Sequence, residues 1–167
     1  KYLNNKNMEE ELKIKSCTGK NLYVKKWIDK NRKQYKGVIQ LVHGMQEQIE
    51  KYNEFATMLM EQGYIVIGHD QLGHGHTASD EELGYFAKKD GWQKLVEDVH
   101  IIQNKIKKEY SKISYIIFGH SMGSLIVRTY ITKYKDNIDG IIISGTTGRK
   151  KGLITAIFLT KLIMLFK

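Results

Sequence analysis

The sequence predicts an α/β domain with a mainly parallel sheet that carries helices on both faces. Two observations lead to this prediction. Short apolar runs of four to six residues, typical of buried parallel strands, alternate with longer segments whose apolar residues recur every three or four positions. Glycines and polar turn residues separate the two kinds of segment. This alternation indicates strand–helix–strand units, in which successive strands lie parallel.

The chain is predicted to open with a β-hairpin. Residues 10–16 alternate the apolar Leu12 and Ile14 with charged neighbours, which is the period of a strand. A turn-forming Thr-Gly-Lys-Asn sequence follows at 18–21, and residues 22–28 form a second predicted strand. The first two strands are therefore expected to pair with each other before the parallel part of the sheet begins.

Four buried strands are predicted after the hairpin, separated by three helices. Tyr52, Phe55, Ala56 and Leu59 show the spacing of one helix face, and Gly63 stands where that helix would end. The strands are predicted at 38–42, 64–67, 115–118 and 138–143, and the helices around 52–59, 92–106 and 125–134.

The composition excludes several functional classes. The net charge is +9 over 167 residues, but the lysines are scattered and the three arginines, at 32, 128 and 149, are not interleaved with aromatic residues as in nucleic-acid sites. The single cysteine, Cys17, rules out an intrachain disulfide and a thiolate zinc cluster. No apolar stretch reaches the roughly 20 residues of a membrane span, and the polar start shows no secretory signal. We therefore predict a cytoplasmic protein.

The strongest chemical signal is a Gly-His-Ser-Met-Gly sequence at 119–123, between a predicted strand and a predicted helix. A nucleophilic serine in such a turn takes a strained backbone conformation, and side chains two residues before and after it would collide with the turn. The turn lifts Ser121 Oγ clear of the sheet at a helix N-terminus, where free N–H groups favour developing negative charge. We predict that Ser121 is a nucleophile for acyl transfer. The alternative is a glycine-bounded turn with an incidental serine.

A second motif is placed to assist that serine. His43, Gly44 and Met45 follow the strand predicted at 38–42. Acyl transfer needs two backbone N–H donors aimed at the developing oxyanion. The residue after the nucleophile, Met122, is predicted to supply one donor, and Met45 in the loop after the earlier strand the other. Taken alone, His-Gly after a strand is also consistent with an ordinary turn that contains a packed histidine.

Three motifs in this order resemble the monoacylglycerol lipase and lysophospholipase branch of the α/β hydrolases, the serine aminopeptidase-like hydrolase family. They are His-Gly-Met-Gln-Glu at 43–47, Asp-Gln-Leu-Gly-His-Gly at 70–75 and Gly-His-Ser-Met-Gly at 119–123. The resemblance extends from about Leu22 to the C-terminus. Gln48 stands where many relatives have histidine, and Ser124 replaces a usual third glycine.

This resemblance implies the α/β-hydrolase fold with a structural loop at 70–75 that shapes the rim of the site. It also implies the roles of three residues, which are Ser121 as nucleophile and Met45 and Met122 as oxyanion donors. Peptidases, acyltransferases and haloperoxidases share the same elbow, so the fold alone does not fix the substrate.

The histidine-rich loop after the strand at 64–67 offers a metal site as an alternative. Its candidate ligands are His69, Asp70, His74, His76 and Asp80. Metallo-β-lactamase-type hydrolases place an aspartate two residues after the second histidine and follow it with another histidine, whereas Asp80 stands four residues after His76. Two or three plausible ligands leave a metal poorly supported. We therefore expect a hydrogen-bonded loop, no metal and no cofactor.

The remaining parts of a serine-hydrolase triad are missing from the sequence. In α/β hydrolases an acid and then a histidine follow the serine, but only Asp136 and Asp139, and no histidine, follow Ser121. The two aspartates come where the chain enters a strand, which is the wrong end of a parallel sheet. His120 cannot bend back to its neighbour's Oγ. Since both ends also look cut, we predict an N-terminal fragment, truncated before the last strands of the sheet and inactive alone.

Residues 1–148 are predicted to form the N-terminal part of the α/β-hydrolase core, and residues 149–167 the start of the lid. In the resembled family the lid follows the strand corresponding to residues 138–143 and covers the site with an apolar wall. The apolar positions of the tail would then line an acyl-chain pocket. An ordinary core helix remains an alternative, as does an interfacial helix whose Lys161 and Lys167 meet anionic headgroups.

The predicted function is that of a serine hydrolase that cleaves carboxylic esters of lipid-like substrates through an acyl-enzyme on Ser121. The expected partner is a small lipid-like ester of the monoacylglycerol or lysophospholipid type, with no nucleic acid. Peripheral membrane contact is left open, as is the oligomeric state. The alternative from another class is a non-catalytic short form that binds a membrane surface or a partner through its basic surface and apolar tail.

Overall fold

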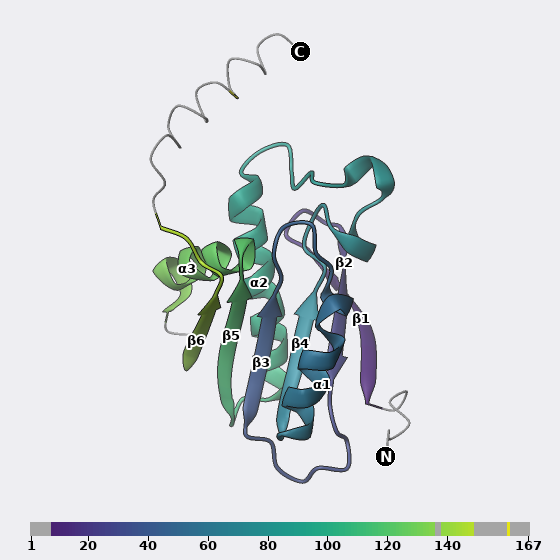
Figure 1. The fold of residues 1–167 in the computed structure, drawn as a ribbon, viewed down its shortest axis with the longest axis vertical. Helices are drawn as coiled ribbons and strands as arrows, with labels where there is room; N and C mark the ends of the chain where they lie inside the picture. Colours follow the sequence, from purple (N-terminus) through teal and green to yellow (C-terminus); the bar gives the residue numbers. More distant parts are fainter. Residues whose placement is uncertain (1–7, 136–137, 149–159, 161–167) are drawn as a thin grey trace.

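The computed structural model describes residues 8–135, 138–148 and 160 of the chain. Within these ranges, six strands form one sheet in the order β1-β2-β4-β3-β5-β6. The strands are β1 (Glu9–Lys15), β2 (Asn21–Trp27), β3 (Gly37–Val42), β4 (Tyr64–His69), β5 (Ser114–His120) and β6 (Gly140–Ser144) (Figure 1). The α-helices are α1 (Asn53–Glu61), α2 (Gly91–Glu109) and α3 (Met122–Tyr134), and the short 3-10 helices are η2 (Ile49–Tyr52), η3 (Gly75–Thr77) and η4 (Asp80–Glu82).

Strand pairing confirms the hairpin and the four parallel strands. β1 and β2 pair antiparallel, while β3 pairs parallel with both β4 and β5, and β5 pairs parallel with β6. The sheet also joins β2 to β4 in antiparallel orientation, which places the hairpin at one edge. β6 begins at Gly140, two residues later than the predicted start. The preceding Asp139 already bonds the backbone of Tyr115 in β5 through both its N–H and its carboxylate.

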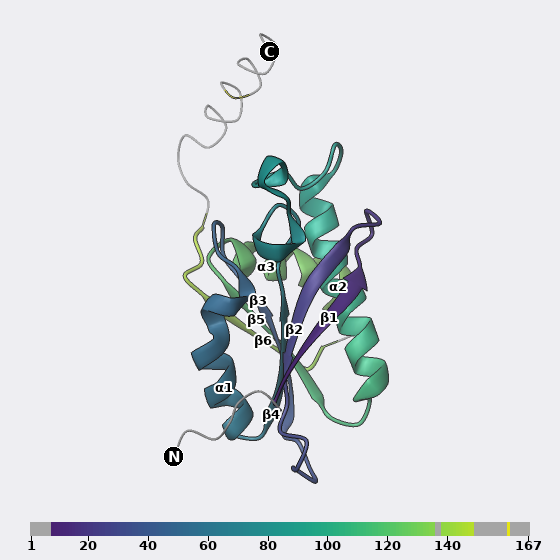
Figure 2. The same cartoon turned by 90° about the vertical axis from the view of Figure 1, so that its right-hand side faces the viewer.

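Helices cover both faces of the sheet, as predicted. Figure 2 shows α1 on one side of the sheet and α2 on the other. Alternate residues of a strand point to opposite faces, so Ile39 and Leu41 of β3 pack in the core on the α1 side. Val38 and Val42 pack on the opposite face with residues of α2 and α3. The carboxyl ends of the parallel strands therefore meet at one edge, between these two helical layers.

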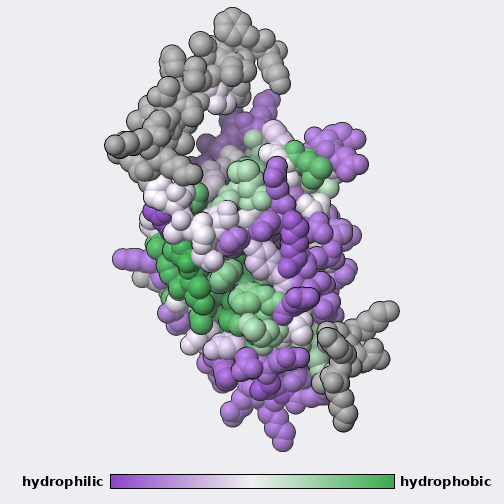
Figure 3. Space-filling view, in the orientation of Figure 1, coloured by the Kyte–Doolittle hydropathy of each residue, from purple (hydrophilic) through white to green (hydrophobic). Residues whose placement is uncertain are grey.

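The outer edge of the sheet at β6 is apolar and exposed. Ile141 and Ile142 are 37% and 47% exposed, although both belong to a strand that reads as buried in the sequence. Figure 3 shows an apolar area on this side of the molecule. An edge strand with free backbone groups and apolar side chains is a template for pairing with another chain. Such an apolar edge fits the predicted truncation before the last strands of the sheet, and it is present among the described residues.

We expect Ile142→Lys to reduce self-association of the 167-residue chain. A lysine on an edge strand opposes edge-to-edge pairing because pairing would bury its charge. Analytical ultracentrifugation should show concentration-dependent association for the wild type and a dissociation constant raised about tenfold or more by the substitution, equivalent to about 1.4 kcal/mol. Met58→Lys, on the exposed face of α1, is the matched control and should associate like the wild type. Equal association of all three proteins would show that the chains do not associate through β6.

Candidate active site

Ser121 occupies a strained turn between β5 and α3. Its φ of 51° and ψ of −118° lie in a region that non-glycine residues rarely adopt, which confirms the conformation predicted for it. The Ser121 N–H donates to Ser144 O at the end of β6 over 2.9 Å, and Ser124 Oγ donates to Ser121 O over 2.5 Å. The strained backbone is therefore held from two sides, and the Ser121 side chain is left exposed.

Glycine is required on both sides of this turn, but for two different reasons. A Cβ added at Gly119 would lie 2.6 Å from Gly123 O, within the turn itself, as predicted. A Cβ added at Gly123 would overlap the carbonyl of Val42 at the end of β3. Gly123 thus allows the N-terminus of α3 to press against the neighbouring strand. Only the first of these two reasons, the collision within the turn, can be predicted from the sequence.

The loop after β3 reaches the nucleophile turn. A Cβ added at Gly44 would lie 3.1 Å from Ser121 Cβ, so the Gly44 backbone packs against the serine side chain. Met45 follows with its side chain 63% exposed. Met122 is the first residue of α3, where helix N–H groups have no intrahelical acceptor. The structure therefore brings the predicted Met45 loop and the Ser121–Met122 turn together, while their role as oxyanion donors remains a prediction.

His43 is a buried structural residue of this loop. Its Nε2 accepts the N–H of Gln71 over 3.1 Å, and its Nδ1 lies 2.7 Å from Gly44 O. This pattern fits a neutral ring that carries its proton on Nδ1 and donates it to the Gly44 carbonyl. Burial lowers the pKa of His43, which favours the neutral form. Both ring nitrogens of His43 therefore contact backbone groups of the two loops and hold them in place.

Glu47 closes the same loop from its other side. Its Oε2 accepts the Gly44 N–H over 2.6 Å and the Tyr52 hydroxyl over 2.8 Å. Burial acts to raise the pKa of Glu47, but these two hydrogen bonds, with smaller contributions from His120 and His43, outweigh it and leave the pKa lowered. Sequence reasoning treated Glu47 only as part of a motif and missed these contacts.

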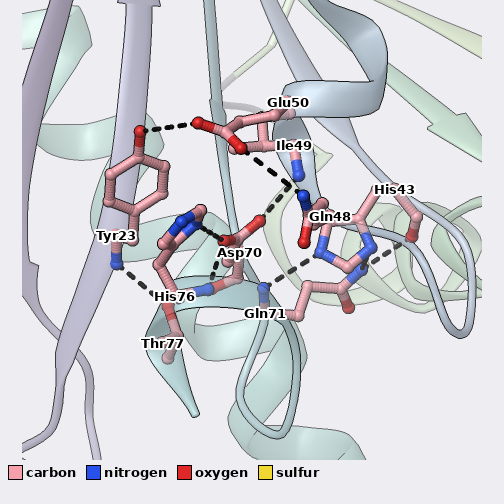
Figure 4. A network of polar contacts seen from close by, with 9 residues as sticks. All are labelled: Tyr23, His43, Gln48, Ile49, Glu50, Asp70, Gln71, His76 and Thr77. Carbon is pink, nitrogen blue, oxygen red and sulfur yellow. Dashed lines mark hydrogen bonds and ion pairs between the residues drawn. The ribbon is translucent and has the colours of Figure 1, made fainter.

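The Asp70 loop is tied together by its own hydrogen bonds (Figure 4). Asp70 is fully buried, and its carboxylate accepts the N–H of Ile49 over 2.6 Å and the N–H of His76 over 2.7 Å. The Thr77 hydroxyl donates to Asp70 O and accepts the N–H of Tyr23 in β2. These contacts fit the structural role expected of the loop.

No group of three histidine, cysteine, aspartate or glutamate side chains in the described ranges is arranged to hold a metal ion. Both Asp70 carboxylate oxygens accept backbone N–H groups, and His74 Nδ1 lies 3.1 Å from Leu72 O. Two of the candidate metal ligands, Asp70 and His74, are therefore engaged by groups of the chain itself.

A cavity of about 1020 Å³ adjoins Met45 on the rim of the site. Apolar and polar side chains share its walls, including Met45, Gln48, Lys51, His76, Leu83 and Phe86. Pockets of this size and mixed lining are typical of small-molecule sites. The loop at 70–75 contributes Gly73, His74 and Gly75 to the same wall, and its role at the rim of the active site stays a prediction.

Other predicted residues lie elsewhere or outside the described ranges. The Asp139 carboxylate accepts the N–H of Tyr115 at the start of β5, at the opposite end of that strand from Ser121, as predicted. Among the described residues, no histidine forms a hydrogen bond with Ser121 Oγ; His120 Nδ1 instead lies 3.3 Å from Ser144 Oγ. Asp136 and the predicted lid at 149–167, apart from residue 160, lie outside the described residues.

A serine in this strained turn, reached by a loop from the neighbouring parallel strand, defines the molecule as an α/β hydrolase. A family model described as serine aminopeptidase, S33, matches residues 33–166, and the chain belongs to that family. The chain is similar to a thermostable carboxyl esterase from Bacillus coagulans, with a TM-score of 0.84 and 29% identity, over 94% of this chain and 50% of that one.

Two curated relatives are similar in sequence. The monoglyceride lipase of Rattus norvegicus is 28% identical over 108 residues, which are 65% of this chain and 34% of that protein. The probable lysophospholipase L2 of Haemophilus influenzae is 30% identical over 104 residues, which are 62% of this chain and 33% of that protein. The aligned part of the chain thus spans about a third of the length of these relatives.

His69, the last residue of β4, gives the fold a testable pH dependence. It is 1% exposed, and among the described residues neither ring nitrogen has a hydrogen-bond partner. Burial, with a smaller effect of His43, lowers the pKa of His69 to about 3. An unfolded histidine titrates near pH 6.5, so below that pH the unfolded state binds more protons than the folded state. Acidification toward pH 3 therefore favours unfolding.

We expect the free energy of unfolding to fall between pH 7 and pH 5, with His69 contributing about 2 kcal/mol of the loss. His69→Leu should remove that contribution, because leucine carries no proton in either state. Urea denaturation at the two pH values measures the difference directly. A wild type and variant that lose equal stability on acidification would show that the His69 ring is not held neutral by its burial.

Proposed function

We propose that this chain is the nucleophile-bearing part of a serine esterase that acts on lipid-like monoesters through an acyl-enzyme on Ser121. The observation that carries the proposal is the strained, exposed Ser121 with the Gly44 loop packed against its side chain. A nucleophile needs this exposure, and the strained turn fixes Oγ relative to the surrounding backbone N–H groups. A similar carboxyl esterase and a similar monoglyceride lipase support ester chemistry.

In the proposed reaction, Ser121 Oγ attacks the ester carbonyl and transfers its proton to a histidine. The N–H groups of Met45 and Met122 stabilise the oxyanion of the tetrahedral intermediate. Collapse of the intermediate expels the alcohol, which takes the proton from the histidine, and water then hydrolyses the acyl-enzyme by the same sequence. We propose that the histidine and its orienting acid belong to a part of the protein beyond this sequence, since the matched relatives are about twice as long as this chain.

The proposed substrate is an ester with an apolar chain and a small alcohol, such as a monoacylglycerol or a lysophospholipid. The cavity beside Met45 supports this class because Met45, Leu83 and Phe86 give it apolar walls while Gln48 and Lys51 supply polar groups. We further propose that residues 1–148 form the core and that residues 149–167 begin the lid.

No helix in the described ranges is long and apolar enough to cross a bilayer.

A substrate panel tests this function in the protein expressed as its gene encodes it. Monoacylglycerol, lysophosphatidylcholine and an aminoacyl p-nitroanilide separate lipase, lysophospholipase and aminopeptidase activities. We expect cleavage of at least one ester, no cleavage of the anilide, and loss of ester cleavage in Ser121→Ala. Cleavage of the anilide alone would make the protein a peptidase. Binding to vesicles without any hydrolysis would favour the non-catalytic alternative.

A further inference from the structure

The Gly44 peptide is enclosed between a carboxylate and the proposed nucleophile. Glu47 Oε2 accepts the Gly44 N–H over 2.6 Å. A Cβ added at Gly44 would lie 2.8 Å from that same oxygen and 3.1 Å from Ser121 Cβ. The Gly44 backbone thus lies between the Glu47 carboxylate and the Ser121 side chain and contacts both. Any movement of the carboxylate will be transmitted to the backbone that borders the serine.

The two polar atoms of Gly44 together set the direction of the Met45 N–H. Its N–H is held by Glu47, and its carbonyl oxygen lies 2.7 Å from His43 Nδ1. The Gly44–Met45 peptide is planar and trans, so the Met45 N–H points opposite to the Gly44 carbonyl. Because the Gly44 N–H and carbonyl are both held by hydrogen bonds, the direction of the Met45 N–H is fixed as well.

The rest of this turn gives little support to that direction. Gln46 has a φ of 58°, a left-handed conformation that is unfavourable for a non-glycine residue. The Met45 side chain is 63% exposed and adds little packing. Lys51 Nζ reaches Gln46 O only over 3.4 Å, from an exposed position. The strained turn therefore depends on the short hydrogen bond from Gly44 to Glu47.

Glu47 is itself held in place by a second donor. The Tyr52 hydroxyl, from η2, donates to the same Oε2 over 2.8 Å, and Tyr52 is half-buried. The neighbouring Glu50 makes different contacts: its oxygens lie 3.5 Å from the Tyr23 hydroxyl and 3.4 Å from Gln48 Nε2. Two glutamates three residues apart thus have separate partners, and the contact with Gly44 comes from Glu47.

We propose that Glu47 is a positioning residue, whose carboxylate, seated by Tyr52, holds the Gly44 peptide so that the Met45 N–H stays aimed at the oxyanion. The proposal rests on the proposed esterase function. Glu47 acts through the backbone and does not take part in bond making. It stabilises the transition state more than the bound ester, because the oxyanion forms only after attack. Loss of Glu47 should therefore lower kcat with little change in KM.

Four variants of the protein expressed as its gene encodes it test this role: Glu47→Ala, Glu47→Gln, Tyr52→Phe and the control Glu50→Ala. Hydrolysis of p-nitrophenyl butyrate gives kcat and KM, and inhibition by a trifluoromethyl ketone reports binding of an oxyanion. We expect Glu47→Ala to lower kcat about 10- to 100-fold, up to the effect of losing one oxyanion donor, and to weaken the ketone by a similar factor. Glu47→Gln keeps an acceptor oxygen and should recover most of kcat.

The Tyr52→Phe variant should lose about threefold or more in kcat, and Glu50→Ala should match the wild type. Unchanged kcat and ketone affinity in Glu47→Ala would overturn the proposal, as would a raised KM at constant kcat or an equal loss in Glu50→Ala. If Glu47→Ala does not fold, Tyr52→Phe and Glu47→Gln decide by the same measurements. The proposed function itself would be overturned first if the wild type did not cleave the ester, or if its ester cleavage persisted in Ser121→Ala.

Discussion

Ser121→Ala is expected to lower ester hydrolysis by the complete protein on the order of 10⁴-fold or more. The reason is that the acyl-enzyme path requires Oγ, which the strained turn at φ 51° places outside the sheet. The variant should keep its fold, since the contacts that hold the turn are made by the Ser121 backbone and survive the substitution. Steady-state kinetics with p-nitrophenyl butyrate, together with a thermal melt, measure both quantities.

Ser111→Ala is the matched control for this experiment. Ser111 is exposed and precedes β5 at the end of that strand opposite Ser121, so its hydroxyl has no route to the proposed site. It should retain wild-type rates. Activity retained within tenfold in Ser121→Ala would mean that another group makes the attack.

The 167-residue chain alone should hydrolyse esters only at the residual rate left by an oxyanion hole and substrate binding, about 10³–10⁴-fold above water. All six histidines precede Ser121, and in the described part of the chain none bonds its Oγ. His43 is engaged with Gly44 and Gln71, and His100 stacks on Tyr134 in the helical layer at 3.7 Å. Within the described residues, therefore, no histidine is hydrogen-bonded to Ser121 Oγ as a base that takes its proton would be.

A direct comparison of this chain with the complete protein, in the same ester assay, checks the missing base. We expect the complete protein to be faster by several orders of magnitude. An ordinary enzymatic rate from the 167 residues would show that one of their own histidines acts as the base. His76 would then be the first residue to replace, because its side chain is 51% exposed on the rim of the site.

Much of the fold could be predicted because its strands and helices have different periods. The runs at 38–42 and 115–118 are apolar on both faces and are found in β3 and β5, the central parallel pair. The strand–serine–helix junction follows from the two glycines around Ser121. The edge at β6 could be predicted only in part, since Ile141 and Ile142 give the same apolar signal whether or not another strand covers them.

The contacts that shape the site could not be predicted because they join residues through turns or across strands. The spacing of Gly44 and Glu47 does not show that the side chain folds back onto the backbone N–H. The fit of Gly123 against Val42 depends on how closely α3 approaches β3. Asp70 accepts the N–H of Ile49, which is 21 residues away along the chain, and the N–H of His76, which is 6 residues away. Such contacts depend on tertiary packing, which periodicity does not report.

Labelling with a fluorophosphonate, followed by peptide mass spectrometry, tests the central claim most directly. In the complete protein we predict one adduct per molecule, on the tryptic peptide 113–128, with fragment ions that place the added mass on Ser121 and not on Ser114 or Ser124. Ser121→Ala should remain unlabelled at the same probe concentration. An adduct on another residue, or undiminished labelling of Ser121→Ala, would contradict the assignment of Ser121 as the nucleophile.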